Sequence, residues 1–183
     1  LLDISKIESG KAELKRSLIN ISDVVRQAAG SFESRIREKG LEMCIDVDNV
    51  SGSVWADADR ITQVLTNLIG NAIKFTSTGH IDISCKDKSD TVVCSVSDTG
   101  VGISKEDMPK IFEKFQQFGR TAGAGDKGTG LGLSIVKNII DMHNGAIWVE
   151  SDPGKGTRIM FKLHKYTLQS LFREYVSKAV KKA

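Results

Sequence analysis

The sequence lacks several features that define common classes of protein. It has no run of about 18 apolar residues, so no membrane-spanning helix is predicted. It begins at Leu1 with neither an initiator Met nor a signal-peptide pattern, and we expect this start to lie inside a longer protein. The phosphate-loop pattern G-x-x-x-x-G-K-S/T is absent, which argues against P-loop ATPases and GTPases. A net charge of +3, without a basic patch interleaved with aromatic residues, argues against a nucleic-acid partner.

Cysteine is scarce, and the three that occur show no CxxC spacing. Cys85 and Cys94 fall on the apolar faces of two alternating segments, whereas Cys44 lies apart from them. We interpret them as core thiols of a reducing compartment, in preference to a disulfide or a metal site. This predicts a cytoplasmic location for the chain, whether or not its parent protein is anchored in a membrane.

The length of 183 residues and a hydrophobic content of 40% predict one domain with a real core and a small appendage. Residues 1–9 are expected to end a helix, and residues 13–20 suit a strand. Apolar residues recur at helical spacing from Ile21 to Ile36, which predicts one long amphipathic helix ended by Gly40.

The rest of the chain mixes strands and helices without a strict βαβ order. Strands are predicted at 41–47, 54–56, 80–86, 91–97, 146–151 and 157–163, and helices at 58–76, capped by Asp57, and at 131–142. Residues 116–129 have the composition of a mobile loop. The predicted fold is an α/β two-layer sandwich, with a mixed, mostly antiparallel sheet and helices on one face.

The helix at 58–76 carries two different faces. Asn67, Asn71 and Lys74 share a face separate from the apolar stripe, which consists of Ile61, Val64, Leu65, Leu68 and Ala72. Amide oxygens are hard ligands suited to Mg²⁺, and a lysine ammonium is suited to phosphate oxygens. The alternative interpretation is an ordinary solvated helix face.

Eight of the 17 glycines lie between residues 98 and 132. Asp98 ends an apolar strand where Gly100 and Gly102 leave room for a flat ligand against the backbone. A buried carboxylate there would select adenine, whose exocyclic amino group is a donor where guanine has an acceptor. The alternative is an Asx turn in a tight loop.

Residues 128–132 (Gly-Thr-Gly-Leu-Gly) open directly into the last apolar helix. Unpaired amides and the positive end of the helix dipole make such a helix start a predicted phosphate-binding site. Residues 123–128 also satisfy G-x-G-x-x-G literally, but no strand leads into them, so the dinucleotide interpretation lacks its required context.

Taken in order, these segments resemble the catalytic and ATP-binding domain of sensor histidine kinases, in the superfamily shared with gyrase, the Hsp90 chaperones and MutL. The similarity covers about residues 13–164 and implies a Bergerat-type ATP-binding fold. Similar motifs are the N box at 67–75, the first glycine box at 98–102, the F box at 112–115, the second glycine box at 128–133 and the last short motif at 154–157. Residues 1–10 resemble the end of a dimerisation helix, which makes residues 11–164 the catalytic domain.

The resemblance implies a role for each matched residue. Asn71 would bind Mg²⁺ with Asn67 nearby, Lys74 would contact phosphate, and Asp98 would accept from the adenine amino group. Thr157 would support adenine through water, and Arg120, in the lid at 116–129, would reach the γ-phosphate unless it is merely solvated. The full set implied to contact ATP is Asn67, Asn71, Lys74, Phe75, Asp98, Gly100, Gly102, Ile103, Phe115, Lys127, Gly128, Thr129, Gly130, Leu131, Gly132, Leu133 and Thr157.

The implied reaction is transfer of the γ-phosphoryl group of ATP to a histidine on a separate dimerisation domain. None of His80, His143 and His164 is followed by an acidic residue in the helical setting that the family uses, so the phosphoacceptor is expected elsewhere. These three histidines are expected to be structural or exposed. The implied partners are that dimerisation domain and a response regulator receiver domain, with a homodimeric full-length protein and a monomeric fragment.

Another class of function stays open: an ATP-binding regulatory module, or a clamp-type ATPase of the same superfamily. By resemblance, the ATPases have at position 67 an acidic residue that activates water, whereas this chain has Asn67. Residues 165–183 fall outside the resemblance and predict an amphipathic helix or linker. This helix would pack on its own domain or join a further one; a partner groove or a membrane surface is the alternative.

Overall fold

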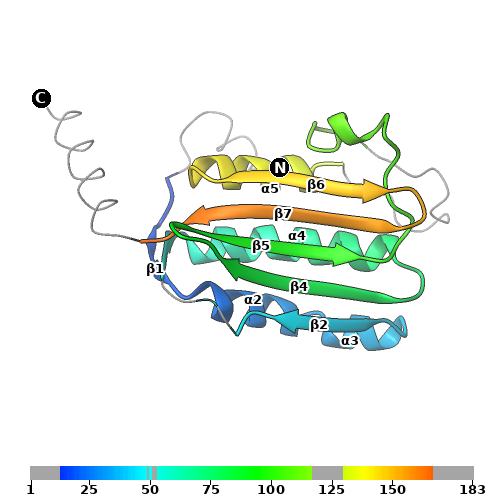
Figure 1. Ribbon diagram of the computed structural model, residues 1–183, viewed down its shortest axis with the longest axis horizontal. Helices are drawn as coiled ribbons and strands as arrows, with labels where there is room; N and C mark the ends of the chain where they lie inside the picture. The colour runs from blue at the N-terminus through cyan, green and yellow to red at the C-terminus, as the bar shows by residue number, and fades with distance from the viewer. Residues whose placement is uncertain (1–12, 49, 51–52, 117–129, 167–183) are drawn as a thin grey trace, which may run out of the picture.

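The computed structural model describes residues 13–48, 50, 53–116 and 130–166 (Figure 1). The elements are β1 (Ser17–Ile19), α2 (Ile21–Gly30), α3 (Glu33–Glu38), β2 (Glu42–Asp46), β3 (Val54–Ala56), α4 (Ala58–Phe75), β4 (His80–Asp87), β5 (Thr91–Asp98), the 3-10 turn η1 (Met108–Lys110), α5 (Gly132–Met142), β6 (Ala146–Asp152) and β7 (Gly156–His164). The predicted helix end at 1–9, most of the loop at 116–129, and the predicted helix or linker at 165–183 apart from Lys165 and Tyr166 lie outside the described residues.

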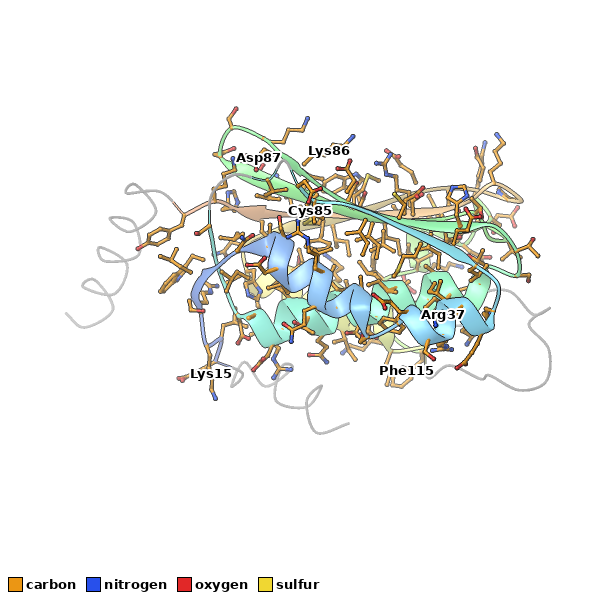
Figure 2. The ribbon with its side chains drawn as sticks, turned by 90° about the horizontal axis from the view of Figure 1, so that it is seen from below. Lys15, Arg37, Cys85, Lys86, Asp87 and Phe115 are labelled. Atoms are coloured by element: carbon orange, nitrogen blue, oxygen red, sulfur yellow. A yellow bond between two sulfur atoms is a disulfide. The ribbon has the colours of Figure 1, made fainter. Side chains whose placement is uncertain are left out.

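The main sheet has five strands in the order β2-β4-β5-β7-β6. Its pairs are antiparallel except β2 with β4, which are parallel. Helices α2, α4 and α5 lie along one face, so the predicted two-layer sandwich is confirmed (Figure 1). Seen along the layers, the β4–β5 turn with Lys86 and Asp87 is on the sheet side, and Arg37 is on the helix side (Figure 2). No helix among the described residues is both long and apolar enough to span a bilayer.

The core lies between the helices and the alternating inner positions of the strands. Ile81, Ile83, Val92 and Phe161 are almost fully buried, and the apolar stripe predicted on α4 is buried as well. Each such side chain contributes roughly 1.5–3 kcal/mol through burial. The outer face is more polar; on it the hydroxyls of Ser84 and Ser95 pair across the β4–β5 ladder at 2.9 Å.

Two predicted elements differ in the structure. The long helix expected from Ile21 to Ile36 is divided into α2 and α3, because the amides of Ser31 and Phe32 both bond to the Ala29 carbonyl in a tight turn. The Ser31 hydroxyl also donates to the Ala28 carbonyl at 2.6 Å. The apolar face survives this break, which is why periodicity did not reveal it. The strand expected at 13–20 is shortened to the three residues of β1.

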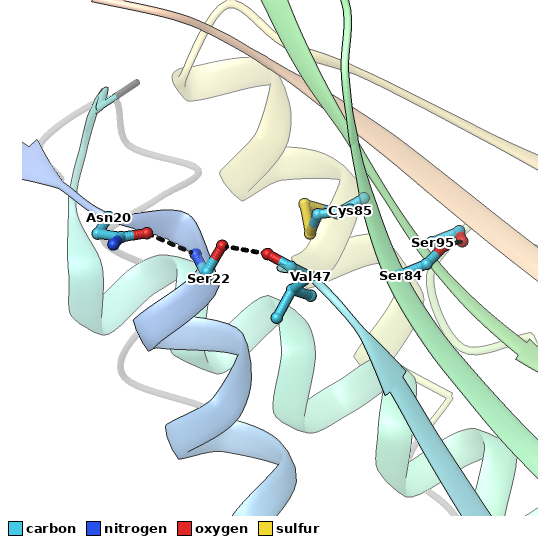
Figure 3. The surroundings of a disulfide bond; sticks show 7 residues. Asn20, Ser22, Val47, Ser84, Cys85 and Ser95 are labelled. Atoms are coloured by element: carbon cyan, nitrogen blue, oxygen red, sulfur yellow. Dashed lines mark hydrogen bonds between the residues drawn. A yellow bond between two sulfur atoms is a disulfide. The ribbon is translucent and has the colours of Figure 1, made fainter. Parts of the chain in front are cut away.

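The prediction of free thiols at Cys85 and Cys94 is wrong, because the structure joins them in a disulfide. The two residues are direct partners in the β4–β5 register, with their Cα atoms 4.1 Å apart. Both are buried on the inner face of the sheet. Figure 3 shows Cys85 in the same region as the Ser22–Val47 hydrogen bond, which ties α2 to the residue after β2. Spacing motifs do not detect such a pair, because the hairpin register rather than sequence distance brings the sulfurs together. Cys44 is free and exposed.

Asp57 connects three elements at one end of the helix layer. Its carboxylate caps α4 by accepting from the Arg60 amide at 3.1 Å, which confirms the predicted cap, and also accepts from the Lys15 amide at 2.8 Å. Its own amide donates to Nε2 of His143 at 3.0 Å, at the end of α5. Since Nε2 accepts, Nδ1 carries the proton and donates to the Ile139 carbonyl at 2.7 Å. His143 is therefore a buried, neutral, structural residue.

The disulfide predicts which thiols can be alkylated and how much reduction lowers the stability of the fold. In protein purified without reductant and then denatured, alkylation should label one thiol, Cys44. Reduction should lower the free energy of unfolding by about 2–3 kcal/mol, from the chain entropy of a loop of about ten residues. Urea unfolding with and without reductant measures this, and a C85A/C94A variant should be insensitive to reductant. Labelling of three thiols in the untreated protein would contradict the bond.

His143 predicts a pH dependence of stability. Burial lowers its pKa below the ordinary value of 6.5; the Ile139 carbonyl raises it, the Arg16 guanidinium lowers it and the Asp57 carboxylate raises it. As pH falls through 6.5, the unfolded chain gains a proton that the folded chain does not take, so the free energy of unfolding should fall.

Urea unfolding between about pH 8 and pH 5 tests this, because that range brackets the ordinary histidine pKa. An H143Q variant should lose the part of the slope that His143 causes, whereas H80Q, at an exposed histidine, should keep it. Equal slopes in the wild type and H143Q would contradict the assignment.

Candidate functional site

One face of α4 contributes the first group of site residues. Asn67, Asn71 and Lys74, which the helical spacing predicted to share a face, are all half-buried. The Asn67 amide nitrogen donates to the Gln63 carbonyl at 2.9 Å, so the amide oxygen is directed outward from the helix. A Cβ at Gly132 would lie 2.9 Å from that oxygen. The start of α5 therefore packs closely on the asparagine face of α4, and a larger residue at position 132 would require the Asn67 side chain to shift.

The amide oxygens on this face suit a hard divalent cation whose remaining ligands come from phosphate and water. Among the described residues, no group of three or more His, Cys, Asp or Glu is placed to hold a metal. Mg²⁺ accepts one or two protein oxygens and takes the rest from phosphate and water, which amides such as Asn71 satisfy. The Lys74 ammonium lies 5.5 Å from the centre of the Phe75 ring, in the last turn of α4.

Asp98 is held at the end of β5 by two backbone donors. Its Oδ1 accepts from the Gly100 amide at 2.8 Å and from the Thr157 amide at 3.3 Å. Burial raises the pKa of Asp98 above its ordinary value, and the two hydrogen bonds lower it, with burial the larger effect. The Asx turn to Gly100 and a ligand-binding role are compatible, because the turn uses Oδ1 and no described residue bonds to Oδ2.

The glycines around Asp98 are required by close backbone approach. A Cβ at Gly156 would collide with the Asp98 carbonyl, and one at Gly102 with the Asp152 carbonyl. Both glycines also have positive φ, of 93° and 69°. The loop after β5 is thus pressed against the β6–β7 turn, and the Gly154 amide bonds to the Val101 carbonyl at 2.8 Å.

Among the described residues, no side chain caps the amides at the start of α5. Leu131 precedes the helix without a side-chain cap, and Gly130 has a φ of 68°. The Gly130 carbonyl accepts from the Phe115 amide at 2.9 Å, and a Cβ on Gly130 would lie 2.8 Å from the Gln116 carbonyl. Phe115 itself is 72% exposed with a φ of 62°. Such a helix start favours an anion.

The described predicted residues thus come from four segments: α4, the end of β5 with the loop after it, the start of α5 with Phe115 bonded to it, and β7. The Val101 amide donates to the Phe75 carbonyl at 3.3 Å, which joins the loop after β5 to the end of α4. Arg120, Lys127, Gly128 and Thr129 lie outside the described residues, and their predicted roles stay predictions. Sequence reasoning missed Ser151, whose hydroxyl accepts from the Ile103 amide at 2.8 Å. The only signal was a polar residue at an inward position of a strand, just before a Pro-Gly turn.

Comparisons with known proteins agree on one family. The model described as histidine kinase-, DNA gyrase B-, and HSP90-like ATPase matches residues 56–167. The non-motile and phage-resistance protein of Caulobacter vibrioides is 36% identical over 97% of this chain and 22% of its own length. The virulence sensor protein BvgS of Bordetella bronchiseptica is 40% identical over 89% of this chain and 14% of its own. The chain therefore spans about a fifth or less of these relatives.

Solved structures share the fold. Full-length ShkA in complex with AMPPNP matches 91% of this chain and 35% of its own, with a TM-score of 0.79 and 30% identity. The catalytic domain of histidine kinase ThkA matches 83% of this chain and 99% of its own, with a TM-score of 0.73 and 37% identity. ThkA in complex with response regulator protein TrrA matches with a TM-score of 0.72 and 34% identity, over 89% of this chain and 46% of its own.

D98N is expected to have opposite effects on stability and on binding, the first because of the raised pKa of Asp98 and the second because the family resemblance implies that its carboxylate accepts from adenine. The ionised carboxylate opposes folding above its raised pKa, and this cost is absent below the ordinary value of 3.8. The stability advantage of D98N over the wild type should therefore grow as pH rises from the acid range to neutrality, while binding of an adenine nucleotide weakens. Urea unfolding and calorimetric titration with ADP measure the two effects.

A matched control is D82N, because Asp82 is half-exposed on the outer face of the sheet. D82N should bind ADP as the wild type does. Its stability relative to the wild type should not show the pH dependence expected for D98N. A D98N variant that is less stable than the wild type at neutral pH and binds ADP equally well would contradict both expectations.

Proposed function

The chain belongs to the histidine kinase-, DNA gyrase B- and HSP90-like ATPase family, and from this premise we propose that it is the catalytic domain of a sensor histidine kinase. Support comes from solved histidine kinases with this fold, one of them in complex with AMPPNP. The observation that carries the proposal is the asparagine face of α4 against the start of α5. In α4 the one acidic residue is Asp59, in the first turn, so the helix has no carboxylate beside this face to activate water.

ATP is proposed to lie across the four segments, with adenine at Asp98 and the phosphates at the start of α5. Asp98 Oδ2 would accept from the adenine amino group. The amide oxygen of Asn71 would hold Mg²⁺, with Asn67 nearby; when bound, the ion would neutralise phosphate charge, and the Lys74 ammonium would contact phosphate oxygens directly. The protein's contribution is binding and orientation, which are what an in-line phosphoryl transfer requires.

The nucleophile is proposed to be a histidine of a separate dimerisation domain. His143 is buried and uses both ring nitrogens in hydrogen bonds within the fold. His80 and His164 border strands, and Nε2 of His80 lies 3.4 Å from an Asp82 oxygen. Neither has the setting of a phosphoacceptor. A response regulator would receive the phosphoryl group in turn, a partner supported by the solved ThkA–TrrA complex.

Incubation with radiolabelled ATP and Mg²⁺ tests the proposal. The chain alone should gain no acid-labile phosphate, whereas a separately purified dimerisation domain of a sensor histidine kinase should become labelled when this chain is added. An N71A variant should lower the labelling rate by at least about a hundredfold, of the order found when a positioning group for transferred charge is removed.

The matched control is T66A, on the same helix, because Thr66 is exposed and bonds only within α4, to the Thr62 carbonyl. It should label the acceptor at the wild-type rate. Rapid release of inorganic phosphate without acceptor labelling would instead indicate a clamp-type ATPase. Phosphate on this chain alone would contradict the assignment of the acceptor to another domain.

A further inference from the structure

Three polar side chains form a row across the inner face of the sheet at its glycine-rich end. Asp98 of β5 pairs directly with Thr157 of β7, and Thr157 pairs with Ser151 of β6. Direct partners in an antiparallel ladder point to the same face. Farther along these strands the inner positions are apolar, including Val96 and Ile159. The row therefore ends the hydrophobic core and begins the polar site.

Ser151 is the most connected member of this row. Its hydroxyl donates to the Gly156 carbonyl at 2.7 Å and accepts from the Ile103 amide at 2.8 Å. The third contact, at 3.0 Å, is with the hydroxyl of Thr157. The hydroxyl thus joins the β6–β7 turn, the loop after β5 and Thr157, which the resemblance predicts to support adenine through water.

The direction of the third bond follows from counting protons. A serine hydroxyl has one proton and two lone pairs. The carbonyl of Gly156 can only accept and the amide of Ile103 can only donate, so the Ser151 proton is used and one lone pair remains. Thr157 must therefore donate its own proton to Ser151. This leaves the Thr157 oxygen with lone pairs only, as an acceptor toward a ligand.

Asp98 and Thr157 therefore both present hydrogen-bond acceptors to a ligand. The Asp98 carboxylate is also an acceptor, and its Oδ1 is already fixed by the Thr157 and Gly100 amides. Two neighbouring acceptors favour a base edge with an amino donor and disfavour one with a carbonyl oxygen. Without Ser151, the Thr157 hydroxyl would be free to rotate and donate to that carbonyl.

We propose that Ser151 is a positioning residue that sets the base specificity of the site, by holding the Thr157 hydroxyl as an acceptor beside Asp98. The inference rests on the proposed function, because it assumes that an adenine nucleotide occupies this end of the sheet. It assigns to Ser151 an effect on the ratio of affinities for 6-amino and 6-oxo purines. If Ser151 acted on stability alone, its substitution would weaken the binding of both nucleotides equally.

The test is calorimetric titration with ADP and with IDP, which carries a carbonyl in place of the 6-amino group. The wild type should prefer ADP. S151A should reduce this preference about tenfold, which is the effect of one hydrogen bond, because the Thr157 hydroxyl could then donate to the 6-oxo group of IDP. S151T, which keeps a hydroxyl, should retain the preference. In a T157V background, S151A should change the ratio no further, because Ser151 acts through Thr157.

The control is S22A, because Ser22 is buried and its hydroxyl makes a similar bond, to the Val47 carbonyl at 2.8 Å, on α2 (Figure 3). It should alter thermal stability without altering the ADP to IDP ratio. If S151A does not fold, S151C keeps the volume with weaker bonding and should reduce the preference in part.

Failure of the inference and failure of the proposed function are distinguishable. A wild type that binds neither nucleotide overturns the proposed function. A wild type that prefers ADP, together with folded S151A or S151C of unchanged preference, overturns the inference alone. An effect of S151A that persists in the T157V background also overturns it.

Discussion

The register between β5 and β7 is the constraint on which the candidate site depends. It places Asp98 opposite Thr157, and the lack of a side chain at Gly156 lets the two backbones come close enough for the Thr157 amide to reach the carboxylate. A slip of one residue would turn Asp98 to the outer face and bring Ser97 inward. The apolar inner residues of both strands prevent this slip, so the core of the sheet specifies the geometry of the polar end.

The helix layer supplies the complementary half of the site by a different principle. On α4, core and site residues alternate around one helix, so the packing that buries Leu68 also fixes where Asn67 and Asn71 point. On α5, the site is the backbone itself at the helix start. Side chains on one helix and, on the other, amides that no described side chain caps therefore meet where the two helices pack together.

Much of this was accessible from the sequence because local rules determine it. The helical periodicity of α4, the Asp57 cap and the stop at Gly40, which has a positive φ, each follow from nearby residues. The Cys85–Cys94 bond and the role of Ser151 depend on strand register, which no local pattern contains. The break at Ser31 escaped detection for another reason, because a tight turn preserved the apolar face that periodicity measures.

The antiparallel helices α4 and α5 are joined at two points, the Asp57–His143 hydrogen bond at one end and the Asn67–Gly132 contact at the other. The 11 residues of α5 span about 16 Å between these points, and an α-helix is stiff along its axis. The segment at Lys15 and Arg16 is bonded to the first of them, through Asp57 and the Met142 carbonyl. The segment before β1 is therefore tied by hydrogen bonds to the C-terminal end of the same helix whose first residue packs on Asn67, so one helix connects the entry of the chain with the asparagine face of α4.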